Sequence, residues 1–161
     1  MIQIRPAVTE DLEVIASLIP NQHELFLVYP DGKYPFDLEQ VSALFNDRVE
    51  FTVICDDGRI IGFANLYQYK PGKYAFIGNV FIKPDCRGQG LGKVMLQYMV
   101  KAAFEKYHLP EVRISVFSEN DTAISLYQHF GFQQYAEEKR IDPQNNSKTL
   151  IHMSLTNPEL Q

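Results

Sequence analysis

A glycine-rich segment, Arg87-Gly88-Gln89-Gly90-Leu91-Gly92, lies between a predicted strand that ends at Ile82 and a predicted helix that begins near Gly90. Glycines let the backbone adopt positive φ angles and approach a ligand closely. The first amides of a helix have no partner within the helix, and the helix dipole adds positive potential there. The segment therefore predicts a site for an anionic group, most often a phosphate. A tight turn without a ligand is the alternative, but it does not need three glycines beside Arg87.

Two common phosphate motifs do not fit this segment. A P-loop requires a glycine at its first position and Ser or Thr after its lysine, whereas Arg87 and Val94 stand at those positions. A dinucleotide fingerprint requires GxGxxG, and the three glycines here are spaced GxGxG. No acidic residue about 20 positions further on ends a second parallel strand. A nucleotide-binding domain of either kind is disfavoured.

The pattern Arg87-x-x-Gly90-x-Gly92 resembles the pyrophosphate loop of the GNAT superfamily of N-acetyltransferases, [RQ]-x-x-G-x-[GA]. A second segment, from Asn120 to Phe132, resembles the family signature N-x-x-A-x-x-[LF]-Y-x-x-x-G-F at every defined position. The two motifs occur in the family's order. The resemblance implies direct transfer of an acetyl group from acetyl-CoA, as cosubstrate, to a primary amine of a small molecule, a protein or a peptide.

The resemblance also implies which residues hold the donor. In the family the strand before the loop is splayed from its neighbour, and its backbone groups bond the pantetheine arm. Amides of the loop hold the pyrophosphate, a lysine adds charge, an asparagine caps the next helix, and a small residue lets the arm pass. The expected cofactor-binding residues are Phe81, Ile82, Arg87, Gly88, Gln89, Gly90, Leu91, Gly92, Lys93, Asn120 and Ala123.

Tyr127 is the expected catalytic residue. Thioester transfer releases a thiolate, and a phenol near the sulfur can donate a proton or a hydrogen bond to it. By helix spacing alone, Tyr127 is a packed aromatic residue with its hydroxyl bonded to the backbone. The surrounding signature, from Asn120 to Phe132, reverses that preference.

The acceptor side of the site is less defined by the sequence. Many members of the family carry Glu or Asp on the strand before the loop, where this chain has Gly78 and Asn79. The usual base is therefore missing, and His23, Glu24 and Glu119 are the other candidates. Entry of the amine in its deprotonated form, or loss of its proton through water, is equally open. A non-catalytic acyl-CoA-binding or sensing module is the alternative function.

The segment 21–36 is rich in aromatic residues and is expected to be part helix and part loop. Members of the family use this region to wall the acceptor site. The aromatic side chains either shape an apolar or cation-binding pocket there or simply cover the sheet; they are Phe26, Tyr29, Tyr34 and Phe36.

The hydrophobic periodicity predicts the elements that position these residues. Strands are expected at 2–5, 50–56, 59–69, 74–82, 112–117, 133–141 and 148–155. Helices are expected at 9–19 (capped by Thr9), 37–45 (capped by Asp37), 91–108 and 120–130. Together with the resemblance, this order predicts an α+β (mixed α/β) fold with a GNAT-like splayed sheet. We expect six to seven mostly antiparallel strands flanked by about four helices.

The bulk properties suit one domain over residues 1–161. The formal net charge of −5 argues against nucleic-acid or membrane partners. Cys55 and Cys86 do not suggest a disulfide framework, which fits the cytoplasm, although Cys86 near a helix start is open to a reactive role. The histidines lack metal-ligand spacing, so no metal is expected. A monomer or a homodimer is expected.

Overall fold

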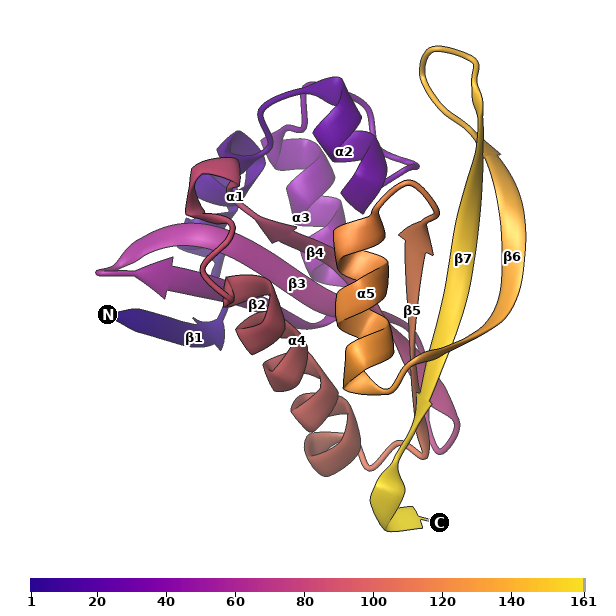
Figure 1. The fold of residues 1–161 in the computed structure, drawn as a ribbon. Coiled ribbons are helices and arrows are strands. Elements are labelled where there is room, and N and C mark those ends of the chain that lie inside the picture. The colour runs from indigo at the N-terminus through magenta and orange to yellow at the C-terminus, as the bar shows by residue number, and fades with distance from the viewer. Residues whose placement is uncertain (161) are drawn as a thin grey trace.

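The computed structural model describes residues 1–160 and contains one seven-stranded sheet. The sheet order is β1-β2-β3-β4-β5-β7-β6, with β4 and β5 parallel and the other described neighbours antiparallel. This confirms the predicted mixed and mostly antiparallel sheet (Figure 1). The strands are β1 (Ile2–Pro6), β2 (Val49–Asp56), β3 (Arg59–Lys70), β4 (Tyr74–Ile82), β5 (Glu111–Phe117), β6 (Gln133–Ile141) and β7 (Ser147–Thr156).

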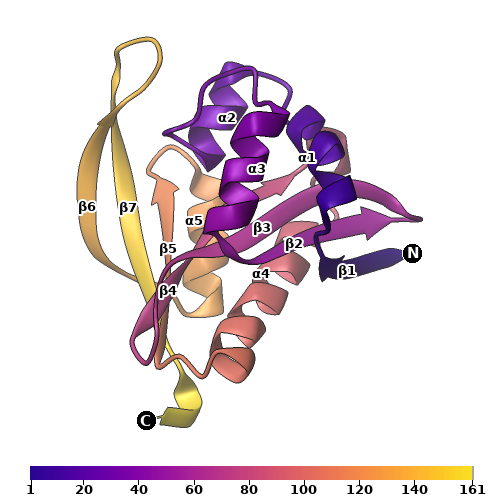
Figure 2. The ribbon, with the colours of Figure 1, turned by 180° about the vertical axis from the view of Figure 1, so that it is seen from behind.

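Helices cover both faces of the sheet, with α4 and α5 on the face seen in Figure 1 and α1 and α3 on the face seen in Figure 2. The described residues contain five α-helices rather than about four. The additional helix is α2, in the segment expected to be part helix, and it begins where the Asn21 side chain accepts from the Glu24 amide. The helices are α1 (Leu12–Leu18), α2 (Gln22–Val28), α3 (Leu38–Asp47), α4 (Leu91–Lys101) and α5 (Asp121–Phe130).

Apolar helix faces pack on the two sides of the sheet. Met95 and Met99 of α4 are fully buried against one side, and Ile15 of α1 and Val41 of α3 are fully buried against the other. Each such side chain contributes about 1.5–3 kcal/mol through burial. The two cores pack on opposite faces of the sheet, so loops at its edge are carried on a packed scaffold.

Local caps explain where the early helices begin. Asp37 caps α3 as predicted, because its carboxylate accepts from the Gln40 amide at 3.0 Å. The prediction that Thr9 caps the first helix is wrong. A 3₁₀ turn spans Thr9–Asp11. The Asp11 carboxylate accepts a hydrogen bond from the Val8 amide at 2.8 Å and also pairs with Arg5. The first helix therefore starts three residues late.

The sheet opens between β4 and β5. Their pairing runs only from Tyr74↔Glu111 to Ile77↔Ile114, although both strands continue beyond it. Asn79 has a positive φ of 50°, next to a register shift against β3. Its buried side chain accepts from Asn65 Nδ2 and donates to the Val28 carbonyl, each at 2.8 Å. These contacts fix a bulge that turns the end of β4 away from β5.

Candidate functional site

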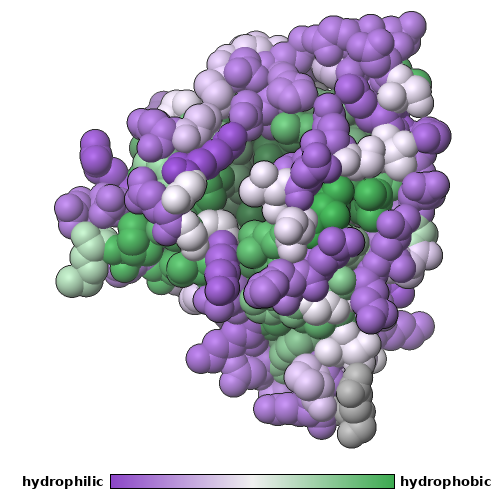
Figure 3. Space-filling model, in the orientation of Figure 1, coloured by the Kyte–Doolittle hydropathy of each residue, from purple (hydrophilic) through white to green (hydrophobic). Residues whose placement is uncertain are grey.

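A cavity of about 1140 Å³ fills the opening between β4 and β5. Figure 3 shows apolar residues in a hollow on this face, with hydrophilic residues around it. Of the twelve residues expected in the site, the cavity is lined by all except Gln89. Those that line it are Phe81, Ile82, Arg87, Gly88, Gly90, Leu91, Gly92, Lys93, Asn120, Ala123 and Tyr127.

The glycine loop leaves backbone amides open at the start of α4. Gly90 is the N-cap residue with φ 81°, and no side chain caps this helix end. A Cβ on Gly88 or Gly90 would meet nothing within 4 Å, so the loop faces open space. The Val94 amide is bonded to the Gly90 carbonyl, which leaves the preceding helical amides for another acceptor. These features fit a phosphate group.

Arg87 braces the loop instead of facing open space. Its amide donates to the Pro84 carbonyl at 3.3 Å, and its Nε donates to the Ile82 carbonyl at 2.8 Å. Its two terminal nitrogens form a bidentate pair with Glu24 at 3.0 and 2.9 Å. The open amides therefore lie after Arg87. The Arg87 hydrogen bonds outweigh burial and lower the pKa of Glu24, which makes this candidate a poor base.

The register of β4 shows which backbone groups face the cavity. The Lys83 amide donates to the Ile61 carbonyl at 2.7 Å, and pairing alternates along an antiparallel ladder. Phe81, opposite Phe63, therefore turns its backbone groups to β3, and Ile82 turns its own to the opening. Since Arg87 already holds the Ile82 carbonyl, the Ile82 N–H is the group left for a ligand. The Phe81 side chain is buried in the core.

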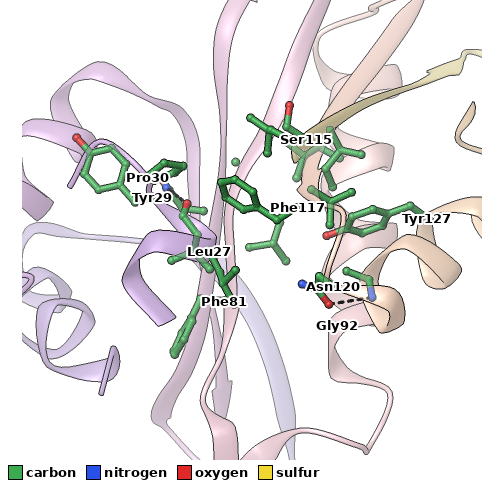
Figure 4. Close-up of a pocket in the computed structure, with 18 of the residues that line it drawn as sticks. Leu27, Tyr29, Pro30, Phe81, Gly92, Ser115, Phe117, Asn120 and Tyr127 are labelled. Carbon is green, nitrogen blue, oxygen red and sulfur yellow. Dashed lines mark hydrogen bonds between the residues drawn. The ribbon is translucent and has the colours of Figure 1, made fainter. Parts of the chain in front are cut away.

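Tyr127 lies on α5 with its hydroxyl pointing into the cavity (Figure 4). The residue is 8% exposed, and within residues 1–160 its hydroxyl has no protein hydrogen-bond partner. Burial raises the pKa of Tyr127 to about 12, so the phenol stays protonated at neutral pH. Asn120 caps α5 by accepting from the Ala123 amide at 3.2 Å, as predicted.

Three polar side chains that the sequence did not single out form a chain at the other end of the cavity. Ser115 Oγ lies 2.7 Å from His152 Nδ1, and His152 Nε2 lies 2.8 Å from a Glu138 carboxylate oxygen. The residues come from β5, β7 and β6 and all line the cavity. Burial raises the pKa of Glu138, but hydrogen bonds from His152 and Arg140 outweigh it and lower the pKa overall. Only strand pairing brings these residues together, with Ser115 directly opposite His152.

The position where many family members carry an acid is physically filled. A Cβ on Gly78 would overlap the Tyr67 ring and would lie 2.8 Å from Arg48 Nη1. The Asn79 side chain is already hydrogen-bonded to the Asn65 side chain and the Val28 carbonyl. No carboxylate fits at Gly78 without displacing its neighbours, so the missing acid is a consequence of how this site is packed.

The remaining candidates divide between wall and core. His23 and Glu119 line the cavity, with Glu119 3.5 Å from Lys148. Burial and the Asp85 carboxylate raise the pKa of the Cys86 thiol, which disfavours a reactive thiolate. Of the four early aromatic residues, only Tyr29 lines the cavity; Phe36 is buried core, Phe26 stacks on Phe117, and Tyr34 bonds the Pro20 carbonyl.

Two negative findings apply to residues 1–160. No group of three or more His, Cys, Asp or Glu side chains is arranged to hold a metal ion. None of the helices has the length and apolar character needed to cross a membrane.

The splayed strand, the glycine loop and Tyr127 border one cavity. The chain belongs to the acetyltransferase (GNAT) family, whose model matches residues 15–132. It is 34% identical over 84 residues to the spermine/spermidine N(1)-acetyltransferase of Bacillus subtilis. The match covers 48% of this chain and 55% of that protein. It is 25% identical to a peptidyl-lysine N-acetyltransferase of Salmonella typhimurium over 83% of this chain and 84% of that protein.

Solved structures share the fold. The spermidine N-acetyltransferase of Vibrio cholerae, in complex with CoA and spermine, matches with a TM-score of 0.82 and 18% identity, over 96% of this chain and 95% of that one. The ribosomal-protein-S18-alanine N-acetyltransferase of Escherichia coli matches with a TM-score of 0.77 and 20% identity, over 97% and 94%. The chain spans about half the length of the first curated relatives it matches, at 55%.

Proposed function

We propose that this protein is an N-acetyltransferase that moves an acetyl group from acetyl-CoA to a primary amine by direct transfer. One observation carries the proposal: the Tyr127 hydroxyl, which has no hydrogen-bond partner within residues 1–160, opens into the same cavity as the uncapped amino end of α4. An anion cradle and a hydrogen-bond donor for a leaving group are the two parts that such a transfer requires.

The loop and β4 are proposed to hold the donor. Amides from Gly88 to Lys93 point to the pyrophosphate, and the Lys93 side chain adds charge. The Ile82 N–H, on the splayed edge of β4, bonds the pantetheine arm. Asn120 and Ala123 border the arm on the side of α5. Arg87 acts indirectly, since it fixes the loop against the Ile82 carbonyl and Glu24.

Acetyl-CoA supplies an activated acetyl thioester, and its sulfur leaves with a negative charge. Tyr127 stabilises that charge as a hydrogen-bond donor. Burial raises the pKa of Tyr127 to about 12, so full proton transfer to a thiolate whose acid has a pKa of about 8.5 is uphill by roughly 5 kcal/mol. Donation without transfer avoids this cost, so Tyr127 acts mainly as an electrostatic stabiliser.

The proton of the acceptor amine is proposed to leave through His152. A neutral imidazole accepts a proton at one nitrogen while it donates from the other. The Ser115 hydroxyl lies 2.7 Å from one ring nitrogen of His152, and a Glu138 carboxylate oxygen lies 2.8 Å from the other, so His152 stands between a relay group and a hydrogen-bond acceptor. This arrangement does the work of the carboxylate that Gly78 cannot carry.

The acceptor is a primary amine of a small molecule or of a protein or peptide. Among the relatives, the spermine/spermidine N(1)-acetyltransferase is named for small-molecule amines and the peptidyl-lysine N-acetyltransferase for an amine of a peptide. The site is proposed to work without a metal or a nucleic-acid or membrane partner, in the cytoplasm, as a monomer or homodimer. A non-catalytic acyl-CoA sensor is the second candidate, favoured by the absent acid at Gly78.

The deciding experiment is an acceptor screen. The protein is incubated with acetyl-CoA and a panel of polyamines, amino acids and peptides, and free thiol and acetylated products are measured by colorimetry and mass spectrometry. An acetylated amine formed together with CoA supports the transferase. Acetyl-CoA binding by calorimetry with no product from any amine supports the sensor.

A variant pair tests the proton route. His152→Gln is expected to lower kcat/KM, because the proton acceptor is gone. His23→Gln, in the wall of the same cavity, is the control and is expected to keep the wild-type kcat/KM. An unchanged kcat/KM in His152→Gln removes His152 from the route.

A further inference from the structure

Arg48 is a partly buried cation at the acceptor end of the cavity. It follows the last residue of α3, and its side chain is 12% exposed. The guanidinium carbon lies 4.2 Å from the centre of the Tyr67 ring and 6.0 Å from that of Tyr29. Its Nη1 lies over Gly78, where β4 leaves β5. The group therefore faces the part of the cavity farthest along β4 from the glycine loop.

The hydrogen-bonding capacity of Arg48 is largely unused by the protein. A guanidinium has five N–H donors, and within residues 1–160 the one side-chain acceptor at hydrogen-bond distance is Asn65 Oδ1, at 3.0 Å. The nearest carboxylate, Asp47, lies 4.0 Å from Nε and is 83% exposed. No buried nitrogen of the described residues lacks a partner, so the other Arg48 nitrogens are accessible, and the residue lines the cavity.

The other charges near this end are already paired. Arg140 lies 3.4 Å from both Asp31 and Glu138, and Glu138 also contacts His152. At the donor end, Arg87 is paired with Glu24. Burial of Arg48 without such a partner is costly, and desolvation lowers its pKa. A ligand anion at this position would recover that cost.

We propose that Arg48 binds a carboxylate of the acceptor, so that the substrate is an amino acid or a close analogue of one. The planar fork of a guanidinium matches a carboxylate with two parallel hydrogen bonds. Asp31 and Glu138 at the same end disfavour a dianionic phosphate. The amine of a small amino acid held at Arg48 lies within the same cavity as Ser115 and Tyr127. This inference rests on the proposed acetyl transfer and names its substrate class.

The test compares matched acceptors. Each set contains an α-amino acid, its neutral amide and the amine left by its decarboxylation, for apolar, acidic and basic side chains. The wild-type protein is expected to prefer the amino acid over both partners by at least about tenfold in kcat/KM, as hydrogen bonds to a charged group predict. Polyamines in the same panel test the substrate class named for the spermine/spermidine N(1)-acetyltransferase of Bacillus subtilis.

Three variants locate the preference. Arg48→Gln is expected to bring the ratio of amino acid to amide close to one, and Arg48→Lys to keep part of it because the charge remains without the fork. Arg140→Gln, a cavity cation with carboxylate partners, keeps the wild-type ratio. If Arg48→Gln does not fold, the test rests on the ratio of amino acid to amide measured for the wild-type protein and for Arg48→Lys. Equal rates on amino acids and decarboxylated amines overturn the inference and leave the transferase standing, whereas no product from any amine overturns both.

Discussion

Replacement of Tyr127 by Phe removes one hydroxyl and keeps the ring. Tyr127 packs against Phe132 with ring centres 6.1 Å apart, and the phenylalanine ring keeps that contact. Because the hydroxyl opens into the cavity and has no partner within residues 1–160, its loss breaks no hydrogen bond of the protein. We expect the melting temperature to stay the same or to rise slightly. The change therefore isolates what the hydroxyl does for a bound substrate.

The expected loss follows from the role of a single donor. Removal of one preorganised donor from a developing negative charge costs about 10²–10³ in kcat, or about 2.7–4 kcal/mol. Sulfur accepts hydrogen bonds more weakly than oxygen, which places Tyr127→Phe at the lower end, about 10²-fold. Acetyl-CoA affinity is expected to change much less, because the charge develops only during transfer.

The assay is steady-state release of thiol under saturating acetyl-CoA, together with calorimetric titration of acetyl-CoA into each protein. A kcat within about threefold of the wild type contradicts the assignment of Tyr127. So does an affinity loss as large as the loss in kcat, since the hydroxyl would then serve binding equally before and during transfer.

Two further predictions test the loop and the scaffold. Gly90→Glu is expected to abolish acetyl-CoA binding in calorimetry. Gly58→Glu is the control, because Gly58 has nearly the same φ (82° against 81°) but lies in a turn outside the cavity, so this variant carries the same backbone strain and is expected to bind acetyl-CoA normally. Equal affinities in both variants refute the loop assignment. Asp11→Asn is expected to lower the free energy of unfolding by about 1–3 kcal/mol at pH 7, because the Arg5 hydrogen bonds outweigh burial and lower the pKa of the folded Asp11 carboxyl. That contribution is present above the unfolded pKa of about 3.9 and is lost as pH falls through the folded value, so urea titrations must show the gap closing in acid; a gap that is constant with pH contradicts it.

The placement of the proposed donor residues around one cavity was predictable because it depends on contiguous segments. A loop supplies its own amides, and a capped helix carries Asn120, Ala123 and Tyr127 at fixed spacing. Spacing along the chain thus translates directly into position in space. The role expected for Arg87 differs in the structure, because its side chain is hydrogen-bonded to the Ile82 carbonyl and to Glu24.

The acceptor half was not predictable in the same way. Ser115, His152 and Glu138 belong to three strands, and register brings them together rather than sequence distance. Arg48 lies at a helix end with no motif around it. The pairing of β5 with β7 across a helix and a hairpin is a long-range choice that hydrophobic periodicity does not specify. The missing acid at Gly78 was visible, but its reason, the Tyr67 ring, was not.

The short parallel ladder between β4 and β5 makes the molecule two half-sheets joined along a narrow seam. A ligand that bonds the exposed edge of β4 and also touches α5 ties those halves together, so its binding energy is added to the cohesion of the whole domain. Amide hydrogen exchange in β5 and β7 would then slow when the donor binds, although the donor touches neither strand through its phosphates. A ligand bound in the cavity would therefore make the two half-sheets less mobile relative to each other.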